Sequence, residues 1–231
     1  MASDNILPLT GIRGIIAQKM SESLQKTAQL SFFCDIDASA LVEARNRWKA
    51  SGLKLGYEDL IIAALTSALR DFPLFNAVET ERGAEPQDQF HVGCAIALPG
   101  ALVAPAIFDV GSLSLADIAQ RRADLVARAK VNKLTIAELT GATVTVTNLG
   151  LTRVEHFTPI LSYPQQAIIG LGRMTARPWV AEDGETLVIR PVMGLSLTVD
   201  HRIIDGAPAG DFLTRLAQEL ESGAAFSPTS G

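Results

Sequence analysis

The residues best suited to chemistry form one short stretch, Asp200-His201-Arg202-Ile203-Ile204-Asp205-Gly206. It follows a long apolar segment typical of a buried strand and precedes a predicted helix. An imidazole, with an ordinary pKa near 6.5, can accept a proton from a thiol, whose ordinary pKa is about 8.5. His201 is therefore a candidate general base, and Asp205 is a candidate partner that orients the site. The alternative is that Asp205 caps the last helix, Pro208 occupies its first turn, and His201 is a hydrogen-bonded core histidine.

A second candidate is the strand-like segment Thr143-Val144-Thr145-Val146-Thr147-Asn148-Leu149-Gly150. Alternation places the valines on one face and the threonines on the other, so Thr147 ends the strand beside a glycine-containing turn. A hydroxyl held there could donate to a developing oxyanion, an interaction often worth about 3 kcal/mol in the transition state. The alternative is that the threonines are the ordinary polar face of a strand.

Composition and charge narrow the classes of protein. The chain has 231 residues, of which 48% are hydrophobic, and no repeat or Pro/Gly/Ser-rich linker divides it. We therefore expect a single domain. The net charge of −5 argues against nucleic acid as the main partner. No apolar run approaches the roughly 20 residues that a membrane crossing needs, and no secretory signal is evident, so a cytoplasmic protein is expected.

The cysteine and histidine patterns give no sign of a metal or disulfide framework. The chain has two cysteines, Cys34 and Cys94, which are predicted to be buried reduced thiols. The three histidines are widely separated and no Cys/His cluster has ligand spacing, so no metal site is expected. His156 is predicted to lie exposed in a loop.

The elements that must position these residues follow from hydrophobic periodicity. Helical spacing predicts helices over residues 10–27, 39–48, 57–71, 114–130 and 207–220. Strand-like patterns cover residues 30–37, 91–98, 102–108, 143–147, 167–171 and 188–199. Helices interspersed with these strands predict an α/β fold, a two-layer mixed β-sheet with packed helices.

Several segments together resemble one known family. They are Leu9–Met20, Lys54–Ile62, Phe75-Asn76, Pro99–Pro105, Thr143–Gly150, Phe157–Leu161, Pro164-Gln165, Ala167–Gly170 and Asp200–Gly206. In this order they resemble the catalytic core of the dihydrolipoyl acyltransferases, the E2 components of 2-oxo acid dehydrogenase complexes. The last segment fits the family signature Asp-His-Arg-x-x-Asp-Gly, which is highly specific.

The resemblance implies a chloramphenicol acetyltransferase-like fold and a homotrimer with active sites at the subunit interfaces. It implies coenzyme A as a substrate, a lipoyl group supplied by another domain or chain, and dehydrogenase components as further partners. The implied activity moves an acyl group, with acetyl the first expectation, between dihydrolipoamide and coenzyme A in a 2-oxo acid or acetoin dehydrogenase complex. The alternatives are a non-catalytic scaffold core and a free-standing small-molecule acetyltransferase.

The resemblance also implies a role for individual residues. His201 would deprotonate the attacking thiol, and Thr147 of the neighbouring subunit would hold the oxyanion. Asp205 would maintain the geometry of the site. Arg13 would approach the phosphates of coenzyme A, or else be a surface arginine of an amphipathic helix, and Asn148 and Gly150 are further candidates for coenzyme A binding.

Departures from the family pattern concern the substrate channel and the assembly. Relatives usually have Pro-His where this chain has Ala28-Gln29, and Arg153 stands where small residues are common. The resemblance covers residues 1–231 as one catalytic domain, with a core of about 6–222 and a tail of 223–231. That leaves no room for a lipoyl or peripheral-subunit-binding domain. Phe226 alone is a large apolar residue in the tail, which is little for a contact between trimers, so a trimer is predicted and assembly beyond it is left open.

Overall fold

The computed structural model describes residues 8–181 and 183–226. Its main feature is a six-stranded sheet of order β1-β10-β9-β8-β4-β7. The strands are β1 (Gln29–Asp37), β4 (Val92–Cys94), β7 (Ala106–Ile107), β8 (Val144–Asn148), β9 (Ala167–Val180) and β10 (Leu187–Asp200). β8 runs parallel to both β4 and β9, and the other neighbouring pairs are antiparallel. The predicted mixed sheet is confirmed.

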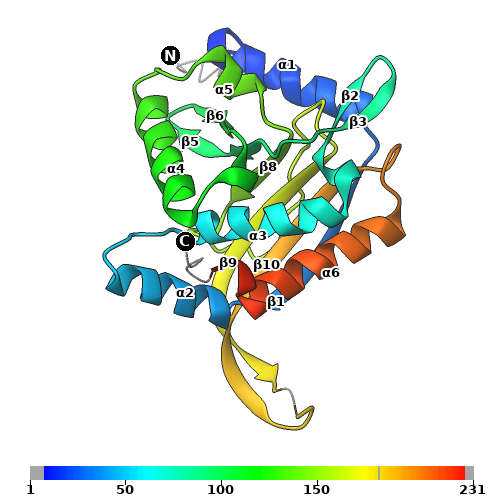
Figure 1. The fold of residues 1–231 in the computed structure, drawn as a ribbon. Helices are drawn as coiled ribbons and strands as arrows, with labels where there is room; N and C mark the ends of the chain where they lie inside the picture. Colours follow the sequence, from blue (N-terminus) through cyan, green and yellow to red (C-terminus); the bar gives the residue numbers. More distant parts are fainter. Residues whose placement is uncertain (1–7, 182, 227–231) are drawn as a thin grey trace, which may run out of the picture.

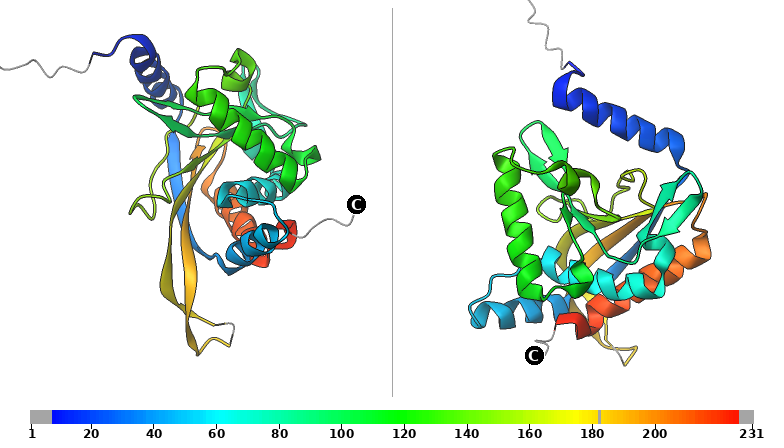
Figure 2. Two further views of the ribbon diagram at one scale, coloured as in Figure 1. Left: turned by 90° about the vertical axis from the view of Figure 1, so that its left-hand side faces the viewer. Right: turned by 45° about the horizontal axis from the view of Figure 1, so that its top comes forward.

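Helices cover one face of this sheet. α2 (Ser39–Ala50), α3 (Tyr57–Asp71) and α6 (Gly206–Ser222) pack side by side against it, as Figures 1 and 2 show. α4 (Leu115–Lys130) and the short α5 (Ile136–Thr140) lie near the β7 edge, while α1 (Gly11–Lys26) lies apart from the other helices. The two layers are those predicted from the pattern of strands and helices.

The central helix α3 has the bounds that the sequence predicts. Its apolar residues are buried on nearly every side, and Pro73, which cannot continue a helix, follows its end. Phe75, in the 3₁₀ turn Pro73–Asn76, stacks on Phe212 of α6 with ring centroids 4.1 Å apart. The stacked rings join the turn that follows α3 to α6, which begins next to the His201 turn.

Two segments that the sequence analysis predicted as single strands are each split in two, the first at Ala95 and the second next to Pro105. Residues 91–98 form β4 and β5 (Ile96–Leu98), and residues 102–108 form parts of β6 (Ala101–Val103) and β7. β5 and β6 make a separate hairpin through Gly100, whose φ is 75°. Pro105 has no N–H, so it cannot extend the ladder, although its carbonyl accepts a hydrogen bond from Cys94.

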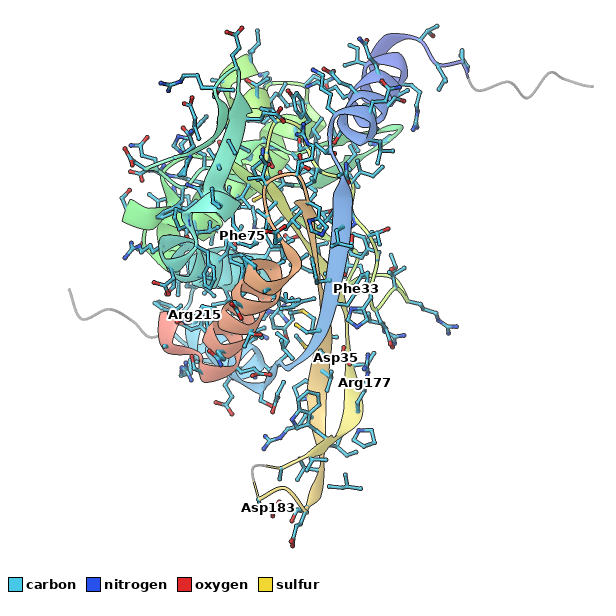
Figure 3. All side chains as sticks on the ribbon, turned by 90° about the vertical axis from the view of Figure 1, so that its right-hand side faces the viewer. Phe33, Asp35, Phe75, Arg177, Asp183 and Arg215 are labelled. Carbon is cyan, nitrogen blue, oxygen red and sulfur yellow. The ribbon has the colours of Figure 1, made fainter. Side chains whose placement is uncertain are left out.

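The sequence analysis also missed two features. It did not predict the hairpin of β2 (Ala77–Thr80) and β3 (Gly83–Pro86) or the helix α5. It ended the strand that begins at Ala167 nine residues too early, at Leu171 instead of Val180. As a result β9 and β10 form a long hairpin that projects beyond the body of the molecule (Figures 1 and 3).

The packed chain extends past the predicted limit of residue 222. Ala224–Phe226 forms a 3₁₀ turn, the Phe226 side chain is fully buried, and Trp48 Nε1 donates to the Phe226 carbonyl at 3.1 Å. Residues 6, 7 and 227–231, which belong to the predicted core and tail, lie outside the described residues. Within the described part of the chain, every helix is too short or too polar to cross a membrane.

Candidate active site

His201 lies in a tight turn at the end of β10. The carbonyl of Asp200 accepts hydrogen bonds from the N–H groups of Ile203 and Ile204, at 3.0 and 2.9 Å. The N–H of His201 donates to the carbonyl of Ala28 at 2.8 Å. Ala28, one of the departures from the family pattern, therefore contacts the backbone of the candidate base directly.

The imidazole of His201 lies at the surface of the single chain. Its side chain is 44% exposed, and Nδ1 is 3.6 Å from Oδ1 of Asp205, too far for a hydrogen bond. Asp205 is at the N-cap position of α6 but its side chain makes no capping bond. The structure therefore corrects the alternative of a hydrogen-bonded core histidine, and it leaves the Asp205 carboxylate next to the ring.

The carboxylate of Asp200 lies buried beneath this turn. Its Oδ1 accepts hydrogen bonds from the N–H groups of Ala28 and Arg202, at 3.1 and 3.0 Å. Oδ2 accepts from Arg202 Nε at 2.8 Å. Burial alone raises the pKa of Asp200, but the donors from Arg202 and Ala28 outweigh it and lower the pKa below its ordinary value. An ionised Asp200 therefore bonds to Arg202, which follows His201, and to Ala28, whose carbonyl accepts the N–H of His201.

Replacing Asp200 with asparagine is expected to lower the free energy of unfolding by about 3 kcal/mol near neutral pH, because one partner of a buried ion pair is lost. The pKa of Asp200 is lowered on folding, so its stabilising effect is complete above the ordinary value of 3.8 and is lost as the pH falls through the lower folded value. Urea unfolding at about pH 7 and about pH 3 measures the effect, and the gap between the two proteins should shrink in acid. A gap that stays constant contradicts the ionised state.

Thr147 lies near the end of β8, with its side chain half-buried. Its strand neighbours on the same face, Thr143 and Thr145, are buried and donate hydrogen bonds to Asn76 Oδ1 and Gln165 Oε1, at 2.6 and 2.7 Å. This corrects the alternative of an ordinary polar face, because only Thr147 of the three is open to solvent. Asn148 Oδ1 accepts the N–H of Gly150 at 2.6 Å, so these two residues shape the turn that follows Thr147.

Within one chain the sheet separates Thr147 from His201. Thr147 pairs with Gly170 of β9, which pairs in turn with Ser196 of β10. His201 lies five residues beyond Ser196, which corresponds to roughly 16 Å along the sheet at the usual rise per residue. The structure brings His201 and Asp205 together at one end of the sheet, and Thr147, Asn148 and Gly150 together elsewhere.

The loop after Thr147 is fixed across the sheet face opposite to the helices. The N–H of Phe157 donates to Ser196 Oγ at 3.2 Å, and Arg173 N donates to the Val154 carbonyl at 2.8 Å. His156 lies in a loop, as predicted, but its side chain is only 30% exposed and its Nε2 lies 3.0 Å from Asp35 Oδ1, so the ring is partly buried and paired. Arg177 donates to the same Asp35 at 2.9 Å. Figure 3 labels both residues, which lie near each other where the hairpin leaves the body of the molecule.

The packing of the loop after Thr147 against the sheet requires a glycine at position 172. A Cβ on Gly172 would overlap the carbonyl of Glu155. Gly172→Ala is therefore expected to destabilise the protein by about 3 kcal/mol, because backbone has to move to make room. Thermal or urea unfolding measures the loss. Gly210→Ala in α6 is the matched control, since a Cβ there meets open space and alanine favours a helix; equal effects in the two variants contradict the tight contact.

Arg13 and Arg153 lie away from His201 of the same chain. Arg13 is in the first turn of α1, whose opposite end leads to Ala28. At the helical rise per residue it lies roughly 20 Å from that end. Arg153 is exposed in the loop that follows Thr147. A role for Arg13 next to His201 is therefore not supported within one chain.

The thiols of the chain are poor nucleophiles. Burial raises the pKa of Cys34 to about 11 and that of Cys94 to about 12. In residues 8–181 and 183–226, His, Cys, Asp and Glu side chains form no group of three suited to holding a metal ion. The site can therefore supply a base, a carboxylate and a hydroxyl, but the nucleophile has to come from a substrate.

Sequence reasoning missed the residues that brace the His201 turn. The signature contains Asp200 and Arg202, but their mutual bonds and the contact of Arg202 with Glu79 appear only in the fold. The signal available in the sequence was an acid next to a basic residue at a strand end. Nothing in it indicates which distant carboxylate completes the pair.

Comparisons of sequence give a consistent set of relatives. A sequence model described as "2-oxoacid dehydrogenases acyltransferase (catalytic domain)" matches residues 2–226. The acetyltransferase component of the pyruvate dehydrogenase complex of Mycobacterium bovis is 41% identical, over 92% of this chain and 40% of the relative. The acetyltransferase component of the acetoin cleaving system of Bacillus subtilis is 36% identical, over 95% and 56%. The succinyltransferase component of the 2-oxoglutarate dehydrogenase complex of Cupriavidus necator is 34% identical, over 93% and 52%.

Solved structures agree with this set. A probable dihydrolipoamide acetyltransferase from Listeria monocytogenes superposes with a TM-score of 0.90 at 30% identity, covering 100% of this chain and 99% of that one. The cubic core of a pyruvate dehydrogenase multienzyme complex gives 0.91 at 30% identity, covering 97% and 94%. A chloramphenicol acetyltransferase gives 0.55 at 18% identity, covering 89% and 93%, which shows a shared fold alone. The chain spans about half the length of the curated relatives it matches.

Proposed function

The chain belongs to the family of 2-oxoacid dehydrogenase acyltransferase catalytic domains, and from that premise we propose that it moves an acyl group between dihydrolipoamide and coenzyme A. The family resemblance and the fold inferred from the sequence are confirmed. Acetyl is the first candidate for the acyl group, because two of the three relatives described above are named as acetyltransferases. The succinyltransferase among them keeps succinyl as the second candidate.

The observation that carries the proposal is the position of His201. Its ring is solvent-accessible, stands on a turn fixed by a buried carboxylate, and has Asp205 3.6 Å away. His201 takes the proton of the attacking thiol, and the thiolate adds to the thioester carbonyl. When the tetrahedral intermediate collapses, the carbon–sulfur bond to the first carrier breaks, and His201 returns the proton to the departing thiolate. The same residues serve both directions because both carriers are thiols.

A second copy of the chain is required for the oxyanion donor. Thr147 and His201 lie far apart along one sheet, so the hydroxyl that faces the reacting carbonyl comes from a neighbour in a homotrimer. A donor placed there stabilises the developing negative charge. Asn148 and Gly150 shape the turn beside it, and Arg13 is available to the phosphates of a coenzyme A bound across the boundary.

Apolar surface left open by the single chain supports this assembly. On one face of the projecting β9–β10 hairpin, Val180, Leu187 and Ile189 are 53%, 72% and 69% exposed. On α1, Ile15 and Leu24 are more than half exposed. Apolar patches of this kind mark interfaces between subunits. Phe226 packs inside its own chain, which leaves it unavailable as an anchor between trimers.

The lipoyl arm and the other components of the complex are supplied by other domains or chains. A lipoyl group carried by another domain or chain delivers the acyl group, and the dehydrogenase components are further partners. Because the match covers about half of each curated relative, the activity of the whole complex is proposed on the strength of the catalytic domain alone.

The test is acyl transfer from acetyl-, succinyl- and branched acyl-coenzyme A to dihydrolipoamide, together with the mass of the protein in solution. A trimer that turns over acetyl-coenzyme A supports the proposal. A stable trimer that is inactive with every donor supports the scaffold alternative. Turnover with small-molecule acceptors but not with dihydrolipoamide supports the free-standing acetyltransferase.

A further inference from the structure

The guanidinium of Arg202 joins two carboxylates from distant parts of the chain. On one side it donates to the buried Asp200, with Nε 2.8 Å from Oδ2. On the other side it donates to Glu79 of β2, with Nη1 3.5 Å from Oε1 and a shorter contact from Nη2 to Oε2. Both carboxylates contribute to raising the pKa of Arg202, so the cation is permanently charged. Glu79 itself is only 24% exposed.

The placement of the His201 ring depends on this network. In the part of the chain that the structure describes, the ring has no hydrogen-bond partner, since Asp205 is 3.6 Å away. The backbone turn that begins at Asp200 therefore determines where the His201 ring lies. Asp200 accepts hydrogen bonds from Ala28 and Arg202. Without Glu79, the guanidinium of Arg202 would lose its contacts with the second carboxylate and keep only those with Asp200.

Glu79 is well placed to serve as a fixed support. Its N–H donates to the Pro164 carbonyl at 2.9 Å, and the preceding Val78 forms a bridge with Gln165. The carbonyl of Gln166, the residue after Gln165, accepts a hydrogen bond from the N–H of Asp200 at 3.2 Å. The β2–β3 hairpin therefore contacts the segment before β9, and that segment in turn contacts the His201 turn.

We propose that Glu79 is a positioning residue for His201 that acts through Arg202, an inference that rests on the proposed acyl transfer. A base that is displaced by a fraction of an ångström loses its alignment with the thiol while the substrates still bind. The expected signature is therefore a fall in kcat with little change in KM.

The experiment compares Glu79→Gln and Glu79→Asp with wild type in the full chain. Glu79→Gln, which removes the charge, should lower kcat about ten-fold while both KM values stay within about two-fold. Glu79→Asp, which keeps the charge, should recover part of that loss. Glu85→Gln is the matched control, because Glu85 lies in the same hairpin and pairs with the exposed Arg82. It should keep the wild-type kcat, since exposed pairs contribute little.

A second readout does not need activity. The ring signals of isotope-labelled histidine report His91, His156 and His201 separately, and Glu79→Gln should move or broaden that of His201 alone. Wild-type kcat and an unchanged His201 signal overturn the inference, as does a loss of activity that only follows loss of the trimer. If Glu79→Gln does not fold, Arg202→Lys replaces it, with the same loss of kcat expected. An inactive wild type whose His201 signal still responds rejects the proposed function and not the support by Glu79.

Discussion

Replacing His201 with alanine is expected to lower kcat for acyl transfer about a thousand-fold, because general base catalysis typically contributes factors of a hundred to ten thousand. The thiols of both carriers are largely protonated near neutral pH. Among the described residues, the ionisable group next to His201 is the carboxylate of Asp205, which is 84% exposed, and carboxylates are in general weaker bases than imidazoles. The residual rate should come from substrate binding and the oxyanion donor alone.

The measurement is the initial rate with acetyl-coenzyme A and dihydrolipoamide, together with the mass in solution. The His201 ring is exposed, so its removal should leave the mass and the unfolding midpoint close to wild type. His91→Gln is the control, because His91 accepts a hydrogen bond from the Asp109 N–H and lies away from the turn. It should lose some stability but keep kcat within about three-fold. A His201→Ala variant with the wild-type rate would falsify the assignment of the base.

Local sequence signals predicted the elements that carry this site. The helix over 57–71 was predicted to the residue because its apolar positions recur through every turn and Pro73 ends it. The helix predicted over 114–130 is α4, whose N-cap is Ser114, and the Ser114 side chain accepts the Asp117 N–H in a capping box. A specific seven-residue signature located the His201 turn, since it combines a strand end, an acid and a helix start.

Features that depend on distant parts of the chain were not predictable. β9 continues past Leu171 although Gly172 and Arg173 interrupt the apolar run, because a bulge there accommodates the loop that carries Glu155. The pairing of His156 with Asp35 joins residues 121 positions apart. The contact of Glu79 with Arg202 spans 123 positions. Such pairs are set by the fold, and no local pattern encodes them.

Mixing two inactive variants is expected to restore activity, which is the sharpest test of a site shared between chains. Alone, His201→Ala should be nearly inactive, and Thr147→Ala should lose about a hundred-fold in kcat, the usual effect of removing one oxyanion donor. In mixed trimers, a chain with Thr147→Ala still supplies His201, and a neighbour with His201→Ala still supplies Thr147. Wild-type sites therefore form at some boundaries, although neither parent contains any.

The size of the recovery distinguishes the two arrangements. With equal amounts and random assembly, about one quarter of the boundaries should combine an intact His201 with an intact Thr147 from the neighbour. Activity should thus rise to about a quarter of wild type, well above the Thr147→Ala variant alone. If one chain supplied both residues, mixing would restore nothing. The control mixes His201→Ala with a chain carrying both substitutions, in which no His201 remains and no recovery is expected. Since the sheet holds Thr147 and His201 of one chain far apart, an absence of recovery in refolded or co-expressed mixtures would reject Thr147 as the donor and leave the oxyanion to another group.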